Sequence, residues 1–168
     1  LLKNKVDNVG GKVIHVPREN TYIGKSICIA LSSPFGVGNS LFRIGSDKEK
    51  FVDTVPFGCY QKSTLFNVNC YDEKIYRSED IFLNYKIIKN GGKILFLPQV
   101  KIYYKTRSRM SEFIKHNFDN GKWSILPIFI SKEFPFSIRH QIPLIFSVYV
   151  LLVTIVSYYS LITIFVLP

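Results

Sequence analysis

The chain has 168 residues, a formal net charge of +10, and 47% hydrophobic and 15% aromatic residues. This is enough for one domain with a packed core. Three cysteines without C-x-x-C spacing and three scattered histidines argue against a disulfide framework or a metal cluster. The positive charge suits anionic lipid or nucleic acid, but the chain has no zinc-finger, basic-zipper or RNA-binding motif.

The N-terminal third is expected to contain strands and one helix. Residues 5–17, KVDNVGGKVIHVP, predict two short strands joined by a turn at Gly10–Gly11. Residues 20–33 carry apolar side chains at near-helical spacing and predict a helix. Residues 32–50, rich in Gly, Ser and Asn, predict a loop, and 50–61 predict an extended segment.

The middle of the chain alternates helices and strands. A short helix and a turn are expected over 62–73. A second helix is expected to begin after Ser78 and to end at Gly91–Gly92. Residues 93–104 predict one or two strands, and 110–121 predict a basic amphipathic helix.

The C-terminal part differs in composition. Residues 125–141 are aromatic, basic and interrupted by prolines, which is typical of an amphipathic segment at a membrane interface. From Gln141 to the end there is no Lys, Arg, Asp or Glu. We predict a transmembrane helix over 142–168, long enough to cross a hydrocarbon core of ~30 Å; a buried core helix is the alternative. The preceding basic residues then place the rest of the chain in the cytoplasm, so we expect an integral cell-membrane protein that contacts membrane lipid.

The adjacent acids Glu79 and Asp80 are the main candidate for chemistry. They follow Ser78 and open the predicted helix, so Ser78 can cap it while both acids favour its dipole. That interpretation needs no catalysis. The alternative is that one of the two carboxylates is a catalytic base, because a carboxylate oxygen can accept a hydroxyl proton.

Five stretches resemble family 2 glycosyltransferases that build polysaccharides, including the succinoglycan type. In chain order they are VGGKVIHVP, SSPFGVGNSLFR, VDTVPFGCYQKSTLF, YDEKIYRSEDIFLNYKIIKNGGKILFLP and HNFDNGKW. The resemblance covers about residues 8–124. It implies an α/β fold, with 1–124 the acceptor half of a GT-A nucleotide-diphospho-sugar transferase domain, followed by the interfacial segment and the transmembrane helix.

The same resemblance implies roles for seven residues. Asp80 would be the catalytic base of an inverting transfer, with Glu79 and Arg77 orienting groups or pairing with a phosphate. FDNGKW resembles the Q-x-x-R-W motif, in which the Trp stacks on the acceptor sugar and neighbouring groups reach the diphosphate. The substrate-binding residues implied in this way are Glu79, Arg77, Asp53, Thr54, Trp123 and Lys122. Asp53 is equally explained as a turn residue, and Trp123 as an interfacial anchor.

The family uses a D-x-D motif to bind a divalent metal, Mg or Mn, that neutralises the leaving diphosphate. No two aspartates in this chain are separated by one residue, so this ligand is absent. We therefore expect a C-terminal fragment, inactive alone, of a metal-dependent enzyme.

The resemblance implies transfer of a sugar from a nucleotide-diphospho-sugar to a saccharide or lipid-linked acceptor in cell-surface polysaccharide synthesis, without nucleic acid as a partner. The alternative is a non-catalytic, membrane-tethered basic module that binds anionic lipid or nucleic acid.

Overall fold

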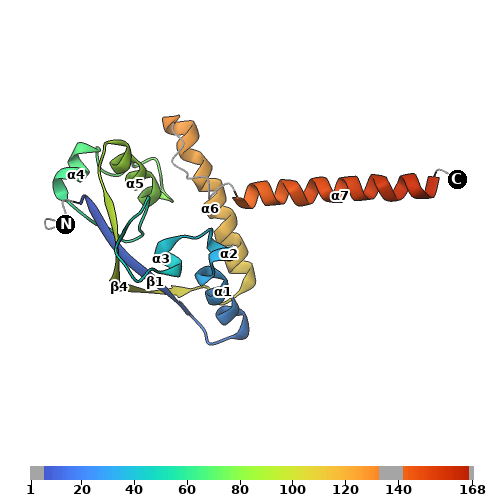
Figure 1. Ribbon diagram of the computed structural model, residues 1–168. Helices are drawn as coiled ribbons and strands as arrows, with labels where there is room; N and C mark the ends of the chain where they lie inside the picture. Colours follow the sequence, from blue (N-terminus) through green and yellow to red (C-terminus); the bar gives the residue numbers. More distant parts are fainter. Residues whose placement is uncertain (1–5, 133–141, 167–168) are drawn as a thin grey trace. The chain divides into compact units, whose positions relative to one another are not determined.

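The computed structural model describes residues 6–132 and 142–166 (Figure 1). The chain divides into two compact units, Leu1–Pro135 and Phe136–Pro168. Helix α7 (Ile142–Val166) belongs to the second unit. The elements of the first unit are β1 (Asn8–Pro17), α1 (Tyr22–Ser32), α2 (Pro34–Val37), α3 (Leu41–Ile44), β2 (Lys50–Phe51), β3 (Cys59–Tyr60), α4 (Lys62–Asn67), α5 (Glu79–Lys89), β4 (Ile94–Thr106) and α6 (Met110–Ser131).

A mixed sheet of four strands, in the order β2-β4-β1-β3, forms the centre of the first unit. The long strands β1 and β4 are parallel, and the short strands β2 and β3 pair antiparallel at the two edges. Because β1 and β4 are parallel, the chain between them has to cross over, and α1 to α5 lie in that connection.

The predicted hairpin at Gly10–Gly11 is wrong, because β1 is one continuous strand through both glycines. Its register against β4 shifts between Gly11 and Lys12. A Cβ atom on Gly11 would lie 2.1 Å from the carbonyl oxygen of Val100 in β4. This glycine therefore permits a close approach of two backbones at an irregular pairing and does not reverse the chain.

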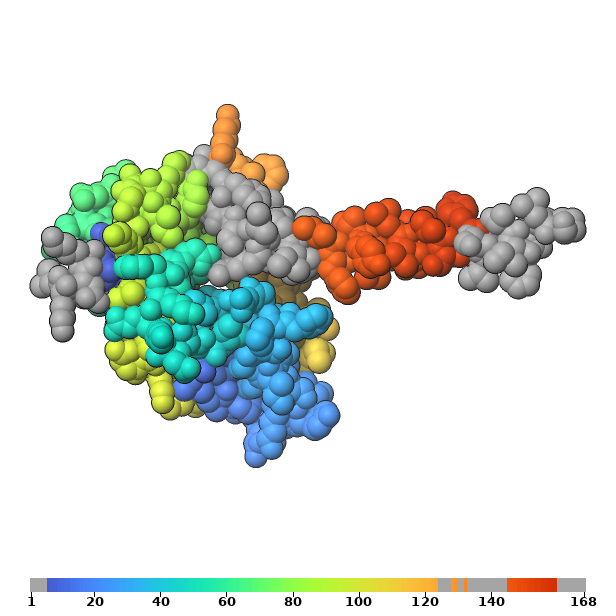
Figure 2. Space-filling view, viewed as in Figure 1, coloured from blue at the N-terminus to red at the C-terminus, as the bar shows by residue number. Residues whose placement is uncertain are grey.

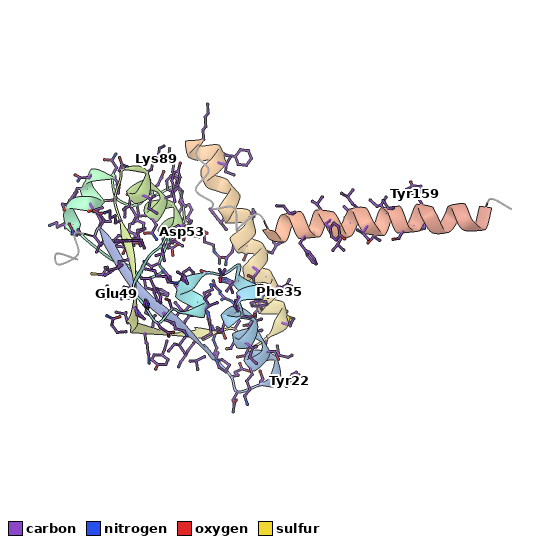
Figure 3. All side chains as sticks on the ribbon, viewed as in Figure 1. Tyr22, Phe35, Glu49, Asp53, Lys89 and Tyr159 are labelled. Carbon is purple, nitrogen blue, oxygen red and sulfur yellow. The ribbon has the colours of Figure 1, made fainter. Side chains whose placement is uncertain are left out.

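Helix α1 confirms the helix predicted over 20–33. The hydroxyl of Thr21 accepts a hydrogen bond from the Gly24 N–H at 3.1 Å and caps the helix, and Ile27 is buried. The predicted loop over 32–50 instead contains two short helices, α2 and α3. Figure 2 shows α1 to α3, in blue to cyan, gathered into one face of the unit. On this face Phe35 is 98% exposed (Figure 3).

Helix α5 carries the core of the unit and confirms the helix expected after Ser78. Leu83 and Ile87 of this helix pack with Ile94 of β4 and with two buried valines, Val55 and Val68. The strand expected over 93–104 is also confirmed, as the single strand β4. The start of α5 is thus held at a defined place beside the sheet by the apolar face one turn further along.

The helix predicted over 110–121 is confirmed in its beginning but not in its end, because α6 continues to Ser131. A Cβ atom on Gly121 would meet nothing within 4 Å, so this glycine sits inside the helix without a packing role. The expected interfacial segment over 125–141 therefore starts within α6. Its remainder, 133–141, lies outside the described residues.

None of the helices in the described part of the chain has the length and apolar character needed to cross a membrane. The expected fold class, an acceptor half followed by an interfacial segment and a transmembrane helix over 142–168, is therefore wrong. The structure shows an α/β unit with a mixed four-stranded sheet.

Candidate functional site

Asp80 lies in the first turn of α5 and is half-buried, whereas Glu79 before it is exposed. One carboxylate oxygen, Oδ1, accepts a hydrogen bond from the Ile81 N–H at 2.8 Å. Burial raises the pKa of the Asp80 carboxyl above its usual value. The Ile81 hydrogen bond opposes this shift and the charge of Glu79 adds to it. A carboxylate with a raised pKa is a better proton acceptor than one in water.

The start of α5 does not have the geometry of an ordinary helix cap. Ser78 is in the left-handed region, with φ +59° and ψ +22°, and its side chain makes no capping hydrogen bond. A non-glycine residue in this region is strained, and such strain is concentrated at functional sites. The capping interpretation of Ser78 therefore lacks its hydrogen bond, although the two acids still favour the helix dipole.

Arg77 connects the start of α5 to α6. Its Nη1 atom donates a hydrogen bond to Oδ1 of Asn120 at 3.2 Å and lies 3.9 Å from Oδ2 of Asp119. Both ends of the ion pair are partly exposed, so its contribution to stability is small. The contacts of Arg77 instead fix positions: they hold the RSED and FDNGKW stretches together.

Trp123 contacts the same region. Its ring meets the ring of Tyr76 edge to face, with centroids 5.7 Å apart and an interplanar angle of 78°. Trp123 is half-buried and Tyr76 is 75% exposed, so the two rings form an exposed aromatic surface. Tyr76 directly precedes Arg77 in the chain. Lys122 beside it is exposed. Arg77, Glu79, Asp80, Lys122 and Trp123 are thus brought to one place, which we call the Asp80 site.

Thr54 lies apart from this surface, in the core. Its hydroxyl oxygen accepts a hydrogen bond from Asn84 Nδ2 at 2.8 Å, and Oδ1 of Asn84 accepts one from Asn8 Nδ2 at 2.8 Å. The three side chains are buried. Thr54 therefore anchors the second turn of α5. Asp53 precedes it in the bend after β2 and is half-buried.

Tyr60 is a neighbour of Asp80 that sequence reasoning missed. Burial raises the pKa of its hydroxyl well above the usual value, with smaller contributions from Tyr71 and from the charge of Asp80. The hydroxyl donates to Oδ1 of Asn84 at 3.4 Å, and the rings of Tyr60 and Tyr71 meet edge to face. Tyr60 therefore stays neutral, and it lies close enough to Asp80 for the charge of the Asp80 carboxylate to act on its hydroxyl. A tyrosine at the end of a two-residue strand gave no signal of this role.

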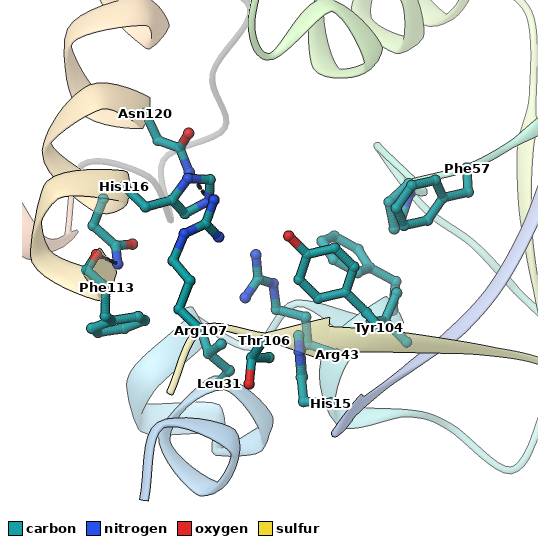
Figure 4. A pocket seen from close by; sticks show the side chains of 14 residues that line it. His15, Leu31, Arg43, Phe57, Tyr104, Thr106, Arg107, Phe113, His116 and Asn120 are labelled. Atoms are coloured by element: carbon teal, nitrogen blue, oxygen red, sulfur yellow. Dashed lines mark hydrogen bonds between the residues drawn. The ribbon is translucent and has the colours of Figure 1, made fainter. Parts of the chain in front are cut away.

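The first unit also contains a cavity of about 210 Å³ (Figure 4). We call it the basic cavity and define it by six of its lining residues, which come from β1, α3, β4, the residue after β4, and α6: His15, Arg43, Tyr104, Arg107, His116 and Asn120. None of the carboxylate side chains described by the structure lines it. His15 and His116 are far apart in the sequence, so their spacing showed no pattern. They come together only through the pairing of β1 with β4 and the packing of α6.

Asn120 links the two regions. It lines the basic cavity, its Nδ2 lies 3.1 Å from Nε2 of His116, and its Oδ1 accepts the hydrogen bond from Arg77. The basic cavity and the Asp80 site are therefore adjacent and share Asn120 of α6.

The described residues contain no group of three or more His, Cys, Asp or Glu side chains that could hold a metal ion. The divalent metal that the family resemblance implies stays a prediction.

Comparisons of the chain with family models, curated proteins and solved structures gave no match.

Proposed function

We propose that this chain carries the acceptor-side residues of an inverting glycosyltransferase of the family 2 type, with Asp80 as the general base. The donor is a nucleotide-diphospho-sugar and the acceptor is a hydroxyl of a saccharide or of a lipid-linked saccharide. The observation that carries the proposal is the place of Asp80. It is a partly desolvated carboxylate at a strained helix start, beside Arg77 and the Tyr76–Trp123 pair.

The reaction balances as a single displacement. The acceptor oxygen forms a bond to the anomeric carbon of the donor sugar while the bond from that carbon to the diphosphate oxygen breaks. The acceptor proton passes to the Asp80 carboxylate, and the bonding electron pair leaves with the nucleoside diphosphate. Attack from the face opposite the leaving group inverts the anomeric configuration.

The neighbours of Asp80 support this chemistry. The aromatic pair Tyr76–Trp123 offers a ring surface on which a sugar can pack. Arg77, three residues before Asp80 in the chain, is fixed from α6 and can hold the acceptor or a phosphate oxygen. Each of these groups comes from a stretch that resembles the family.

The test is sugar transfer by the full protein that contains this chain. Nucleotide-diphospho-sugars are supplied one at a time with a saccharide acceptor, and release of nucleoside diphosphate is measured. Asp80→Asn removes the base without changing side-chain size and should lower turnover at least ~100-fold while donor binding persists. Glu112→Gln is the matched control, because Glu112 is an acid in the first turn of α6.

Unchanged turnover in Asp80→Asn refutes the base assignment. A protein that releases no nucleoside diphosphate from any donor, yet binds anions, favours the second candidate, a non-catalytic basic module. The observation in favour of that module is the basic cavity.

A further inference from the structure

We propose that the basic cavity is a binding site for a phosphoryl group. The inference concerns anion binding only, so it stands whether or not Asp80 is a catalytic base.

The charge of the cavity is the first argument. Arg43 and Arg107 both line it, and within the described part of the chain neither guanidinium is paired with a carboxylate. Burial lowers the pKa of Arg43, which shows that its charge is partly removed from water. A buried, unpaired charge is costly unless a counter-charge is present. Arg43 is the desolvated charge, and Arg107 adds a second guanidinium at the same cavity, so the pair fits a ligand that carries two negative charges.

Unsatisfied polar atoms are the second argument, independent of charge. Both ring nitrogens of His15 and the Nδ1 atom of His116 are buried and have no hydrogen-bond partner in the described structure. A neutral imidazole always carries one N–H donor, so at least one donor of His15 is left unused. Buried polar atoms are almost always paired, and an unpaired one indicates a missing partner. A ligand oxygen in the cavity supplies that partner.

The arrangement of the donors is the third argument. Figure 4 shows the guanidinium groups of Arg43 and Arg107 and the hydroxyl of Tyr104 ending around the same space, with His116 and Asn120 on the α6 side. The arginines come from α3 and from the residue after β4. Donors that converge from separate elements suit a tetrahedral anion, and arginine binds phosphate oxygens in pairs. A carboxylate ligand carries a single charge on two coplanar oxygens, so it would leave some of these donors without an acceptor.

The size of the cavity limits the ligand. Its volume of about 210 Å³ is below the ~300 Å³ at which sites for drug-sized molecules begin. Phe57 and Tyr104, with ring centroids 6.4 Å apart, both line it. The cavity therefore holds a phosphoryl group and a small adjoining piece, and the remainder of a larger ester extends outside it.

The experiment measures binding to the full chain by calorimetry at pH 7 with three separate probes. Inorganic pyrophosphate and uridine diphosphate represent free phosphate, and phosphatidylcholine vesicles with and without phosphatidic acid represent a lipid headgroup. Binding of the first two alone assigns the site to a free or nucleotide phosphate. Binding only when phosphatidic acid is present assigns it to a lipid headgroup.

Variants locate the site. Arg43→Gln and Arg107→Gln should each weaken binding at least ~10-fold, because each removes hydrogen bonds between charged groups. Arg18→Gln is the matched control: it removes the same charge from an exposed arginine that directly follows β1 and does not line the cavity, and binding should change less than ~2-fold. Arg43→Lys keeps the charge and loses the paired donors, so its loss of affinity should lie between those of Arg43→Gln and Arg18→Gln.

A readout on the unmodified chain does not depend on any variant folding. Burial, followed by the charge of Arg43, lowers the pKa of His15 from 6.5 to about 4. A bound phosphoryl group favours the protonated ring, so pyrophosphate should raise the His15 pKa measured by NMR titration of the ring protons. Failure of all three probes to bind, an equal loss in Arg18→Gln, or an unmoved His15 pKa in the presence of a bound probe would overturn the proposal.

Discussion

Asp80 is held in a position where its ionised form is less stable than in water. The chain keeps it there with a strained residue before it and a buried helix face after it. A purely structural role does not require this, because an amide at the same place would make similar contacts without the desolvated charge. At the scale of the residue, the raised pKa and the left-handed Ser78 are therefore the features that separate a functional carboxylate from a helix-start acid.

This difference makes a prediction about stability and pH. The folded pKa of Asp80 is raised above the unfolded value, so its protonated form stabilises the fold below the unfolded pKa, and that contribution is lost as pH rises through the folded pKa. Asp80→Asn should therefore be more stable than the unmodified chain at pH 7. The gap should close as pH falls below the usual aspartate pKa. Thermal unfolding from acid to neutral pH measures it, and a less stable variant at pH 7 contradicts it.

Strand β1 is the element on which the site depends. Its parallel pairing with β4 places His15 opposite Tyr104 and, through Asn8 and Asn84, ties the sheet to α5. The irregular register at Gly11 adjusts the pairing halfway along the strand. The basic cavity and the Asp80 site therefore both depend on how closely β4 approaches Gly11.

Replacement of glycine tests that dependence. Gly11→Ala places a Cβ atom 2.1 Å from the Val100 carbonyl oxygen, a backbone atom, and should destabilise the fold by about 1–3 kcal/mol or more. Gly121→Ala is the control, since its Cβ meets nothing within 4 Å in the middle of α6, and it should stabilise by about 0.5–1 kcal/mol. Urea unfolding of both variants gives the comparison. Equal changes in the free energy of unfolding at the two positions would show that the fold does not depend on the close approach of β4 to Gly11.

At the scale of the whole molecule, the apolar residues described as buried belong to the first compact unit. The core formed around Leu83 and Ile94 lies within Leu1–Pro135, and the described side chains of α7, from Ile145 to Tyr159, are exposed. The fold and the candidate site are thus properties of the first unit.

Truncation after Pro135 is the corresponding prediction. The shortened chain should keep the cooperative unfolding transition of the whole chain, with little change in midpoint, because every core residue that the structure describes is kept. Circular dichroism during heating measures the transition. Loss of cooperativity in the truncated chain would mean that residues after Pro135 contribute to the fold.

The sequence by itself determined the elements whose signals are local. Apolar spacing predicted α1, α5 and the start of α6, and it placed Asp80 at a helix start, because helical periodicity is encoded within a few neighbouring residues. A local signal misled where the contact came from far along the chain: Gly10–Gly11 looked like a turn and lies within a continuous strand. Thr54, which the family resemblance implied as a substrate-binding residue, is hydrogen-bonded to Asn84 in the core.

Only the tertiary structure decided which residues share a surface. The contacts of Arg77 with Asn120 and of Tyr76 with Trp123, and the gathering of His15, Arg43 and Arg107 into one cavity, follow from strand pairing and helix packing. These interactions join residues far apart in the chain, and no short-range periodicity records them. The polar atoms left without partners in that cavity likewise become visible only once every neighbour is in place.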